Sequence, residues 1–272
     1  MPKKSDKRAR FLKKSRESVK EAMKSRDMLL ASVTKSIESL DKTINLLGEH
    51  LEDWYSIYFP ELKLDDRVKF ARLVMMLDRK DVDQKELASL VGDKKAAEIK
   101  EAAQGSLGAE LSREDLSQCM ALARFVADLD KQRSKYGEYQ EKLARELCPN
   151  ISEVAGPDLA AKLVSHMGSL SKLALLPASA VQVIGAEKAL FKHLKNRKVP
   201  PPKHGLIFQH ARVSSSPKKV RGKIARALAN KITLAAKADA FSKRDISEKL
   251  RKEFDERYKE IMKEYEKERK KK

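Results

Sequence analysis

Lysines, arginines and histidines are concentrated between residues 184 and 240. This segment carries 14 Lys and Arg against 2 acidic residues, a net charge of +12. Basic side chains with almost no acids beside them are suited to bind a polyanion, because they create a strong positive field. We therefore interpret the segment as a polyanion-binding surface, with RNA as the leading candidate.

Three lysines of this segment share one expected helix face. Lys188, Lys192 and Lys195 are four and three residues apart, which places them on the same side of a helix. A solvated surface face is one explanation. The scarcity of nearby acids favours the other, in which these lysines contact an RNA backbone and lose affinity as salt rises.

Two residues before these lysines have open roles. Glu187 is one of only two acids in the segment. We expect it either to form a surface salt bridge with Lys188 or Lys192, or to contact a base amino group or a partner protein. Gly185 either allows close backbone approach to a ligand or relieves packing.

Three of the five histidines of the chain lie here, at His193, His204 and His210. Their separations of 11 and 6 residues fit no common zinc pattern, so we expect no metal site. A neutral histidine can stack on a base or hydrogen bond to it, which we expect for His210 with Gln209. A purely structural role is the alternative. The segment Gly205–Phe208, between His204 and Gln209, is predicted to be a short extended run.

A second basic group follows Ser214-Ser-Ser-Pro217. Arg221, Lys223 and Arg226 lie near an expected helix N-terminus, where backbone N–H groups and arginines together bind phosphate well. Arg212 adds to the same field. The pair Gly222-Lys223 is not a P-loop, because the required first glycine and the following Ser or Thr are absent.

No motif in the chain points to catalysis. There is no Gly-x-Ser-x-Gly, no His-Glu-x-x-His and no pair of acids in a glycine-rich context. Cys119 and Cys148 are too isolated for a zinc site and are expected to be reduced thiols of an intracellular protein. We therefore expect neither an enzyme nor a cofactor.

Composition predicts an α-helical protein. The chain has 272 residues, of which 41% are hydrophobic, enough for a core, and 36% charged, which indicates long solvated helices. Low aromatic, Gly and Pro contents disfavour an all-β fold. The charge is uneven, with a net of +8 over residues 1–26 and −5 over residues 27–183. Neither a signal-peptide core nor an 18-residue apolar window occurs, so no membrane partner is expected.

Two long heptad seams predict an antiparallel coiled coil within one chain. Apolar residues step by threes and fours in the first, with only Arg26 breaking the series: Val19, Met23, Leu30, Val33, Ile37, Leu40, Ile44, Leu47, Leu51, Trp54 and Tyr58. The second contains Leu116, Met120, Ala123, Val126, Leu129, Arg133, Tyr136, Gln140, Leu143 and Leu147. Arg133 and Gln140 are polar and could fix the register. Pairing of each helix with another chain is the alternative.

The remaining segments complete an expected domain plan. Residues 1–15 are a basic flexible arm, and residues 16–150 form the coiled-coil domain with a helical tip insertion at 61–106. Residues 151–265 form a compact α-helical domain that ends in a helix with an apolar stripe, opened by a capping box at Ser242–Asp245. Residues 266–272 are a charged tail.

Several co-linear motifs resemble those of the Nop-domain family. They are Gly185-Ala-Glu-Lys-Ala-Leu-Phe-Lys192, Pro202-Lys-His-Gly-Leu-Ile-Phe-Gln-His210, Arg221-Gly-Lys-Ile-Ala-Arg226, Pro177–Ile184, Asp41–Leu47, Trp54-Tyr55 and Phe59-Pro-Glu-Leu62. Together they cover most of residues 20–265, and the sequence is most similar to the archaeal core proteins of box C/D small ribonucleoproteins. Family members in archaea usually have Arg at the position of Lys192, which keeps the charge but not the planar fork.

The resemblance implies a scaffold rather than a catalyst. Family members bind a kink-turn guide RNA together with the small ribosomal-protein-like subunit seated on it, and pair through the coiled coil to support 2'-O-methylation. The resemblance assigns RNA and protein contacts to Gly185–Lys188 and Ala189–Lys192. Together with the basic, histidine and glutamine residues considered above, the predicted RNA-binding residues are Gly185, Ala186, Glu187, Lys188, Lys192, His193, Lys195, Lys203, His204, Gln209, His210, Arg212, Arg221, Lys223 and Arg226. The implied location is cytoplasmic in an archaeon and nucleolar in a eukaryote.

One family feature is not matched. Archaeal members carry an N-terminal domain that docks the fibrillarin methyltransferase, whereas the first seam here starts within about 20 residues of Met1. We expect fibrillarin to be a partner only if such a domain exists elsewhere. The competing function is a structural or dimerisation coiled coil whose basic domain binds any polyanion.

Overall fold

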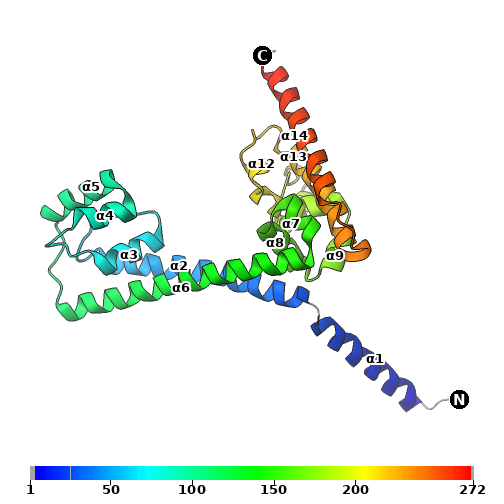
Figure 1. The fold of residues 1–272 in the computed structure, drawn as a ribbon, viewed down its shortest axis with the longest axis horizontal. Helices are drawn as coiled ribbons and strands as arrows, with labels where there is room; N and C mark the ends of the chain where they lie inside the picture. Colours follow the sequence, from blue (N-terminus) through cyan, green and yellow to red (C-terminus); the bar gives the residue numbers. More distant parts are fainter. Residues whose placement is uncertain (1–3, 25, 271–272) are drawn as a thin grey trace. The chain divides into compact units, whose positions relative to one another are not determined.

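The computed structural model describes residues 4–24 and 26–270, and these residues form helices without a β-strand (Figure 1). A single β-bridge links Asp78 and Asp81. The all-α class is therefore confirmed. The chain divides into two compact units, residues 36–137 and residues 1–35 with 138–272, which are taken in turn below.

Two long helices, α2 (Arg26–Tyr55) and α6 (Arg113–Leu147), contribute to both units. In the unit of residues 36–137 they supply one hydrophobic core, in which Ile44 and Leu51 of α2 are clustered with Ala123 and Val126 of α6. These four positions belong to the two heptad seams, so this part of the seams is buried in an intrachain helix pair. The seam prediction missed Cys119, which is also fully buried here.

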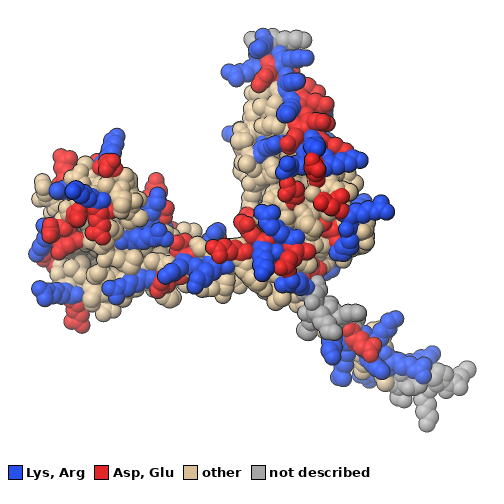
Figure 2. Space-filling model, viewed as in Figure 1, with Lys and Arg blue, Asp and Glu red and all other residues tan. Residues whose placement is uncertain are grey.

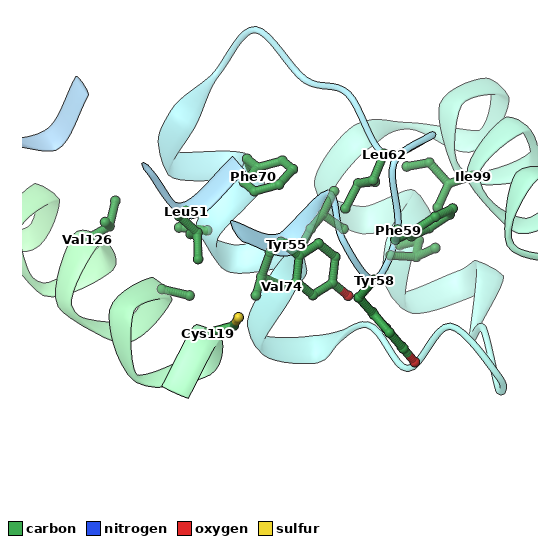
Figure 3. Close-up of a cluster of buried hydrophobic side chains, with 14 of the residues drawn as sticks. Leu51, Tyr55, Tyr58, Phe59, Leu62, Phe70, Val74, Ile99, Cys119 and Val126 are labelled. Atoms are coloured by element: carbon green, nitrogen blue, oxygen red, sulfur yellow. The ribbon is translucent and has the colours of Figure 1, made fainter. Parts of the chain in front are cut away.

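Three short helices cover the end of this pair: α3 (Arg67–Met76), α4 (Gln84–Val91) and α5 (Asp93–Gln104). Asp66 and Asp83 cap α3 and α4 by accepting hydrogen bonds from the backbone N–H groups of the first turn. Tyr55 packs edge-on against Phe70 at 6.1 Å between ring centroids, inside the cluster of Figure 3. The three short helices therefore share one hydrophobic core with α2 and α6.

Arg79 ties the loops of this unit together. Its side chain is 8% exposed, and its guanidinium donates hydrogen bonds to the carbonyl oxygens of Tyr58 and Gly108. It also pairs with Glu110 at 2.7 Å and lies 4.3 Å above the Tyr58 ring. Two connections that are far apart in sequence are thus fastened by one cation.

The first helix, α1 (Lys4–Lys24), differs from the flexible arm expected for residues 1–15. Its sequence has neither Gly nor Pro and is rich in Lys, Arg and Glu, which are good helix formers. Val19 is exposed, as is Phe11, and burial along the first seam starts at Leu30. The side chain of Met23, another expected seam residue, lies outside the described part.

In the second unit, α2 and α6 are joined by polar contacts. Gln140 is buried and donates to the hydroxyl of Thr34 at 2.9 Å, while Arg26 pairs with Glu146. Gln140 is one of the two polar positions expected to fix the register. The other, Arg133, pairs with Asp41 at 2.8 Å within the unit of residues 36–137.

Residues 149–270 fold around α13 (Arg221–Lys237), which buries eight residues. The helices in contact with it include α7 (Pro149–Ala155), α9 (Leu170–Ala174), α10 (Ala178–Val183) and α14 (Ser247–Lys270). The short helix α12 (Ala211–Ser214), the 3-10 turn η1 (Leu206–Gln209) and the π-helical turn η2 (Ala238–Ser242) contact it too. The domain also contains α8 (Pro157–Met167) and α11 (Glu187–Lys195). Buried Asp239 accepts hydrogen bonds from the backbone N–H groups of Asn150 and Ile151, which anchors α7.

One local expectation agrees with the structure and two differ. The helix expected after Pro217 begins at Arg221, so Arg221, Lys223 and Arg226 lie near its N-terminus. Gly205–Phe208 is not extended, because Ile207 is buried and the residues after Gly205 close a 3-10 turn. The last helix begins at Ser247, where Asp245 rather than Ser242 accepts the backbone N–H, and it continues to Lys270 through most of the expected tail.

Candidate nucleic-acid interface

Helix α11 presents the three predicted lysines to solvent. Lys188, Lys192 and Lys195 are exposed, and α11 buries none of its residues. Within the described chain, no acidic side chain forms an ion pair with any of the three. The ammonium groups of these lysines are therefore available to bind phosphate.

Apolar side chains of α11 are exposed as well. Phe191 is 66% exposed and Leu194 51%, and each directly precedes one of the lysines in the sequence. Large apolar groups left in water beside a cationic face indicate a surface that contacts more than a phosphate backbone. Neither Phe191 nor Leu194 was among the predicted site residues. Because both are exposed, α11 has an apolar face as well as a cationic face without partners inside the protein.

The turn before α11 is held by Glu187. Gly185 adopts φ +84°, and a Cβ there would lie 2.8 Å from Leu206 Cγ, so this turn requires glycine. The Gly185 N–H donates to Glu187 Oε1 at 2.7 Å, and His166 Nε2 lies 2.8 Å from the same oxygen. Burial opposes ionisation of Glu187, but these hydrogen bonds outweigh it and lower its pKa. Glu187 thus pairs with His166 rather than with Lys188 or Lys192, and Ala186 is the N-cap of α11.

The histidines are engaged within the domain. His193 Nδ1 hydrogen bonds to the carbonyl oxygen of Val199. His204 stacks on Phe208 with ring centroids 4.7 Å apart, and burial together with Arg221 lowers the pKa of His204. His210 packs edge-on against Phe254, and burial lowers its pKa too. Low pKa values keep His204 and His210 neutral at neutral pH, the form that can accept or donate a hydrogen bond.

A basic groove lies beside the Gly185 turn. Lys203, Lys219, Lys223 and Arg226 line this groove of about 370 Å³, together with Pro200, Pro201, Pro202, Gln182 and Gly222. Gln182 is buried, and its side-chain amide donates to the Lys203 carbonyl oxygen at 2.6 Å. Its backbone carbonyl oxygen accepts a hydrogen bond from the Gly205 N–H. The groove wall is therefore fixed, and three of the predicted residues come together in it.

The remaining predicted residues have internal roles. Arg221 donates to the carbonyl oxygens of Ser214 and Ser216, so its guanidinium holds the loop before α13. Arg212 pairs with Asp255 and lies 5.2 Å from the Tyr258 ring centroid. Gln209, His210 and Arg212 line a second groove, of about 420 Å³, with residues of α7, α8 and α14.

The described residues contain neither a cluster of metal-ligating side chains nor a membrane-spanning helix. None of their His, Cys, Asp and Glu side chains gather into a group of three that could hold a metal ion. No helix among them is long and apolar enough to cross a membrane.

Comparison with known proteins decides the family. The family model for "Nop: snoRNA binding domain, fibrillarin" matches residues 36–260. The chain belongs to the Nop family. A NOP5 family protein of Methanocaldococcus jannaschii is 41% identical over 254 residues, and nucleolar protein 56 of Caenorhabditis elegans is 38% identical over 256. These matches cover 92% and 89% of this chain but only 61% and 52% of the relatives, so the chain spans a little over half of their length.

A solved relative agrees with the Nop fold. The crystal structure of a fibrillarin/Nop5p complex contains a chain that matches with a TM-score of 0.54 and 27% identity. The match covers 93% of this chain and 78% of that one. The resemblance to the Nop family is therefore confirmed. The motif Gly185–Lys192 that suggested it forms the α11 face and turn described above.

Sequence reasoning missed two further residues near the site. Lys162 of α8 donates to Gln209 Oε1 at 2.9 Å, and His166 of α8 meets Glu187. The spacing of Asp158, Lys162 and His166 by four residues was visible in the sequence as one helix face. Nothing in the sequence, however, says which distant loops that face touches.

Proposed function

We propose that this chain is the RNA-binding scaffold of a box C/D-type small ribonucleoprotein, without a catalytic site of its own. It recognises a kink-turn guide RNA together with a small kink-turn-binding protein. The observation that carries the proposal is the exposure of unpaired lysines and large apolar side chains on α11. A phosphate backbone explains the lysines, and a protein seated on that RNA explains Phe191 and Leu194.

The basic groove extends the RNA contact. None of its lining residues belongs to α11, so one domain can hold RNA at two places. The predicted residues fall into two classes. Gly185, Ala186, Glu187, Lys188, Lys192, Lys195, Lys203, Lys223 and Arg226 meet or shape the RNA surface, and His193, His204, Gln209, His210, Arg212 and Arg221 support it.

Self-association through the helix pair forms the second part of the proposal. In the unit of residues 36–137, Leu46, Trp54 and Phe125 are exposed although they lie on α2 and α6. Apolar side chains at such positions are typical of helices that pair with a second chain. Two copies joined in this way would place two RNA-binding domains on one guide RNA.

Fibrillarin is proposed as a partner of the assembly. The comparison chain forms a complex with fibrillarin, and the match spans 78% of that chain. We propose that the methyltransferase joins through family segments that precede the matched region. We propose that the assembly is cytoplasmic in an archaeon and nucleolar in a eukaryote. The name of nucleolar protein 56 indicates the second location for that relative.

An electrophoretic mobility shift assay tests the proposal. We expect a kink-turn RNA loaded with its kink-turn protein to bind much more tightly than the same RNA alone, because the composite surface uses both faces of α11. A duplex RNA without the kink, and with the same number of phosphates, is the control. Equal affinity for all three would instead support a coiled-coil protein with a generic polyanion-binding domain.

A further inference from the structure

Helix α8 places three polar side chains in a row on one face. Asp158, Lys162 and His166 are each four residues apart, so they follow one another along the helix. The other side of α8 is anchored in the core by Leu159, Ala160, Ala161, Leu163 and Val164, all buried. The polar row is therefore mounted on a rigid support.

This row touches two segments that are distant in sequence. Lys162 Nζ lies 2.7 Å from Asp158 Oδ2 and 2.9 Å from Gln209 Oε1. His166 Nε2 lies 2.8 Å from Glu187 Oε1. The middle residue of the row therefore contacts the η1 turn, and the last residue contacts the start of α11.

The contact at Glu187 has a consequence for the Gly185 turn. Glu187 Oε1 accepts both the Gly185 N–H and, from a suitable tautomer, the His166 N–H. Two donors on one oxygen fix the carboxylate in a single place. Without His166 the carboxylate keeps one donor and can rotate toward the surface where phosphate would approach, which like charges oppose.

We propose that His166 is a positioning residue of the RNA-binding surface, holding Glu187 so that the Gly185 turn and the lysines of α11 face the RNA. Lys162 performs the same task for Gln209. The inference rests on the proposed function of this surface. His166 itself is not placed in contact with RNA. It acts through Glu187, and its effect is on the affinity of an assembled complex.

Substitutions of His166 test its role, with affinity for the kink-turn RNA and its protein measured by fluorescence anisotropy. We expect H166A to weaken binding about fivefold, which corresponds to the loss of one net hydrogen bond. We expect H166Q to recover most of this loss, because its amide N–H₂ can reach Glu187 as a donor. A residue needed only to fill space would be rescued as well by H166L, which cannot donate a hydrogen bond, as by H166Q.

A double-mutant cycle supplies the decisive reading. If His166 acts through Glu187, H166A in an E187A background should change affinity by less than about twofold. H50A, which removes an exposed histidine of α2, is the matched control and should bind like the wild type. Circular dichroism melting curves should show each variant folded.

The outcomes separate the inference from the function on which it rests. If the wild type does not prefer the protein-loaded RNA, the proposed function fails. If the wild type shows that preference but H166A binds equally well, or H166A and E187A are additive, the positioning role is wrong. An H166Q variant as weak as H166A contradicts it too.

Discussion

Basic residues are treated differently in two regions of this molecule. In the unit of residues 36–137, arginines are paired with acids: Arg67 with Glu52, Arg72 with Asp130 and Arg79 with Glu110. Figure 2 shows Lys and Arg interspersed with Asp and Glu on the visible face of this unit. On α11, Lys188, Lys192 and Lys195 have no acidic partner among the described residues.

This difference indicates what distinguishes a structural cation from one that binds a ligand. The presence of an acidic partner matters more than the net charge of the region. A paired arginine inside a loop network has its donors satisfied and its field cancelled. An unpaired lysine on a surface costs little in water but gains strongly from a phosphate. Variants that remove cations from each region should therefore affect different properties.

The largest effect is expected for R79A. This change removes the donors to the carbonyl oxygens of Tyr58 and Gly108 and leaves them half-buried without a partner. We expect a loss of about 2–4 kcal/mol in the free energy of unfolding, measured by urea denaturation. RNA affinity of the folded fraction should be unchanged.

The matched control for this variant is R72A, which removes an arginine that is 49% exposed and paired with Asp130 at 3.0 Å. Surface pairs contribute less than about 1 kcal/mol. If R72A destabilised the protein as much as R79A, the burial of Arg79 would not explain its effect on stability. The hydrogen bonds of Arg79 would then have no special role.

The next effect in size is expected for the triple variant K188A/K192A/K195A. It should lower affinity for the protein-loaded kink-turn RNA by about 10- to 100-fold at physiological salt. The slope of log affinity against log salt should fall by up to about 3, because each lysine neutralises at most one phosphate. Melting temperature should be nearly unchanged, since α11 buries none of its residues.

A triple variant of the other region keeps the total charge change equal. K85A/K94A/K95A removes three cations from α4 and α5. We expect RNA affinity and the salt slope to stay at wild-type values. A comparable loss in both triples would mean that net charge alone drives binding, and the contrast between the two regions would be broken.

Several features of these regions could be predicted from the sequence because they are local. The heptad seams predicted the buried positions Ile44, Leu51, Ala123 and Val126, and the motifs around Gly185 predicted the Nop family. Gln140 was expected to fix the register and does bind Thr34. Periodicity, spacing and glycine requirements are all properties of neighbouring residues.

Other features depend on contacts between distant segments. The roles of Arg79 and His166 require loops 29 and 21 residues away to fold onto them. Gly205–Phe208 was wrongly expected to be extended, because the burial of Ile207 and the hydrogen bonds of Gly205 and Leu206 are tertiary. Phe191 was missed for the same reason, because no local sequence pattern shows whether an apolar side chain is exposed in the fold.

A smaller effect is expected for F191A, which tests the apolar part of α11. We expect affinity for the protein-loaded RNA to fall about fivefold to tenfold, because a large apolar side chain at an interface is lost. Affinity for the same RNA without its protein should not change. Leucine at position 191 keeps most of the apolar area and should bind almost normally, whereas an equal loss on bare RNA would assign Phe191 to a base contact.

The smallest effect is expected for E264Q, which turns a paired cation into an unpaired one. Glu264 lies 3.8 Å from Lys223, a cation of the basic groove, and both side chains are about half exposed. Removing this acid should free Lys223 and strengthen RNA binding by about twofold, since an exposed ion pair is weak. E253Q, which breaks the pair with Lys231, changes net charge equally and should have no effect. Equal strengthening by both, measured in the same anisotropy assay, would show that overall charge rather than local pairing sets the affinity of the groove.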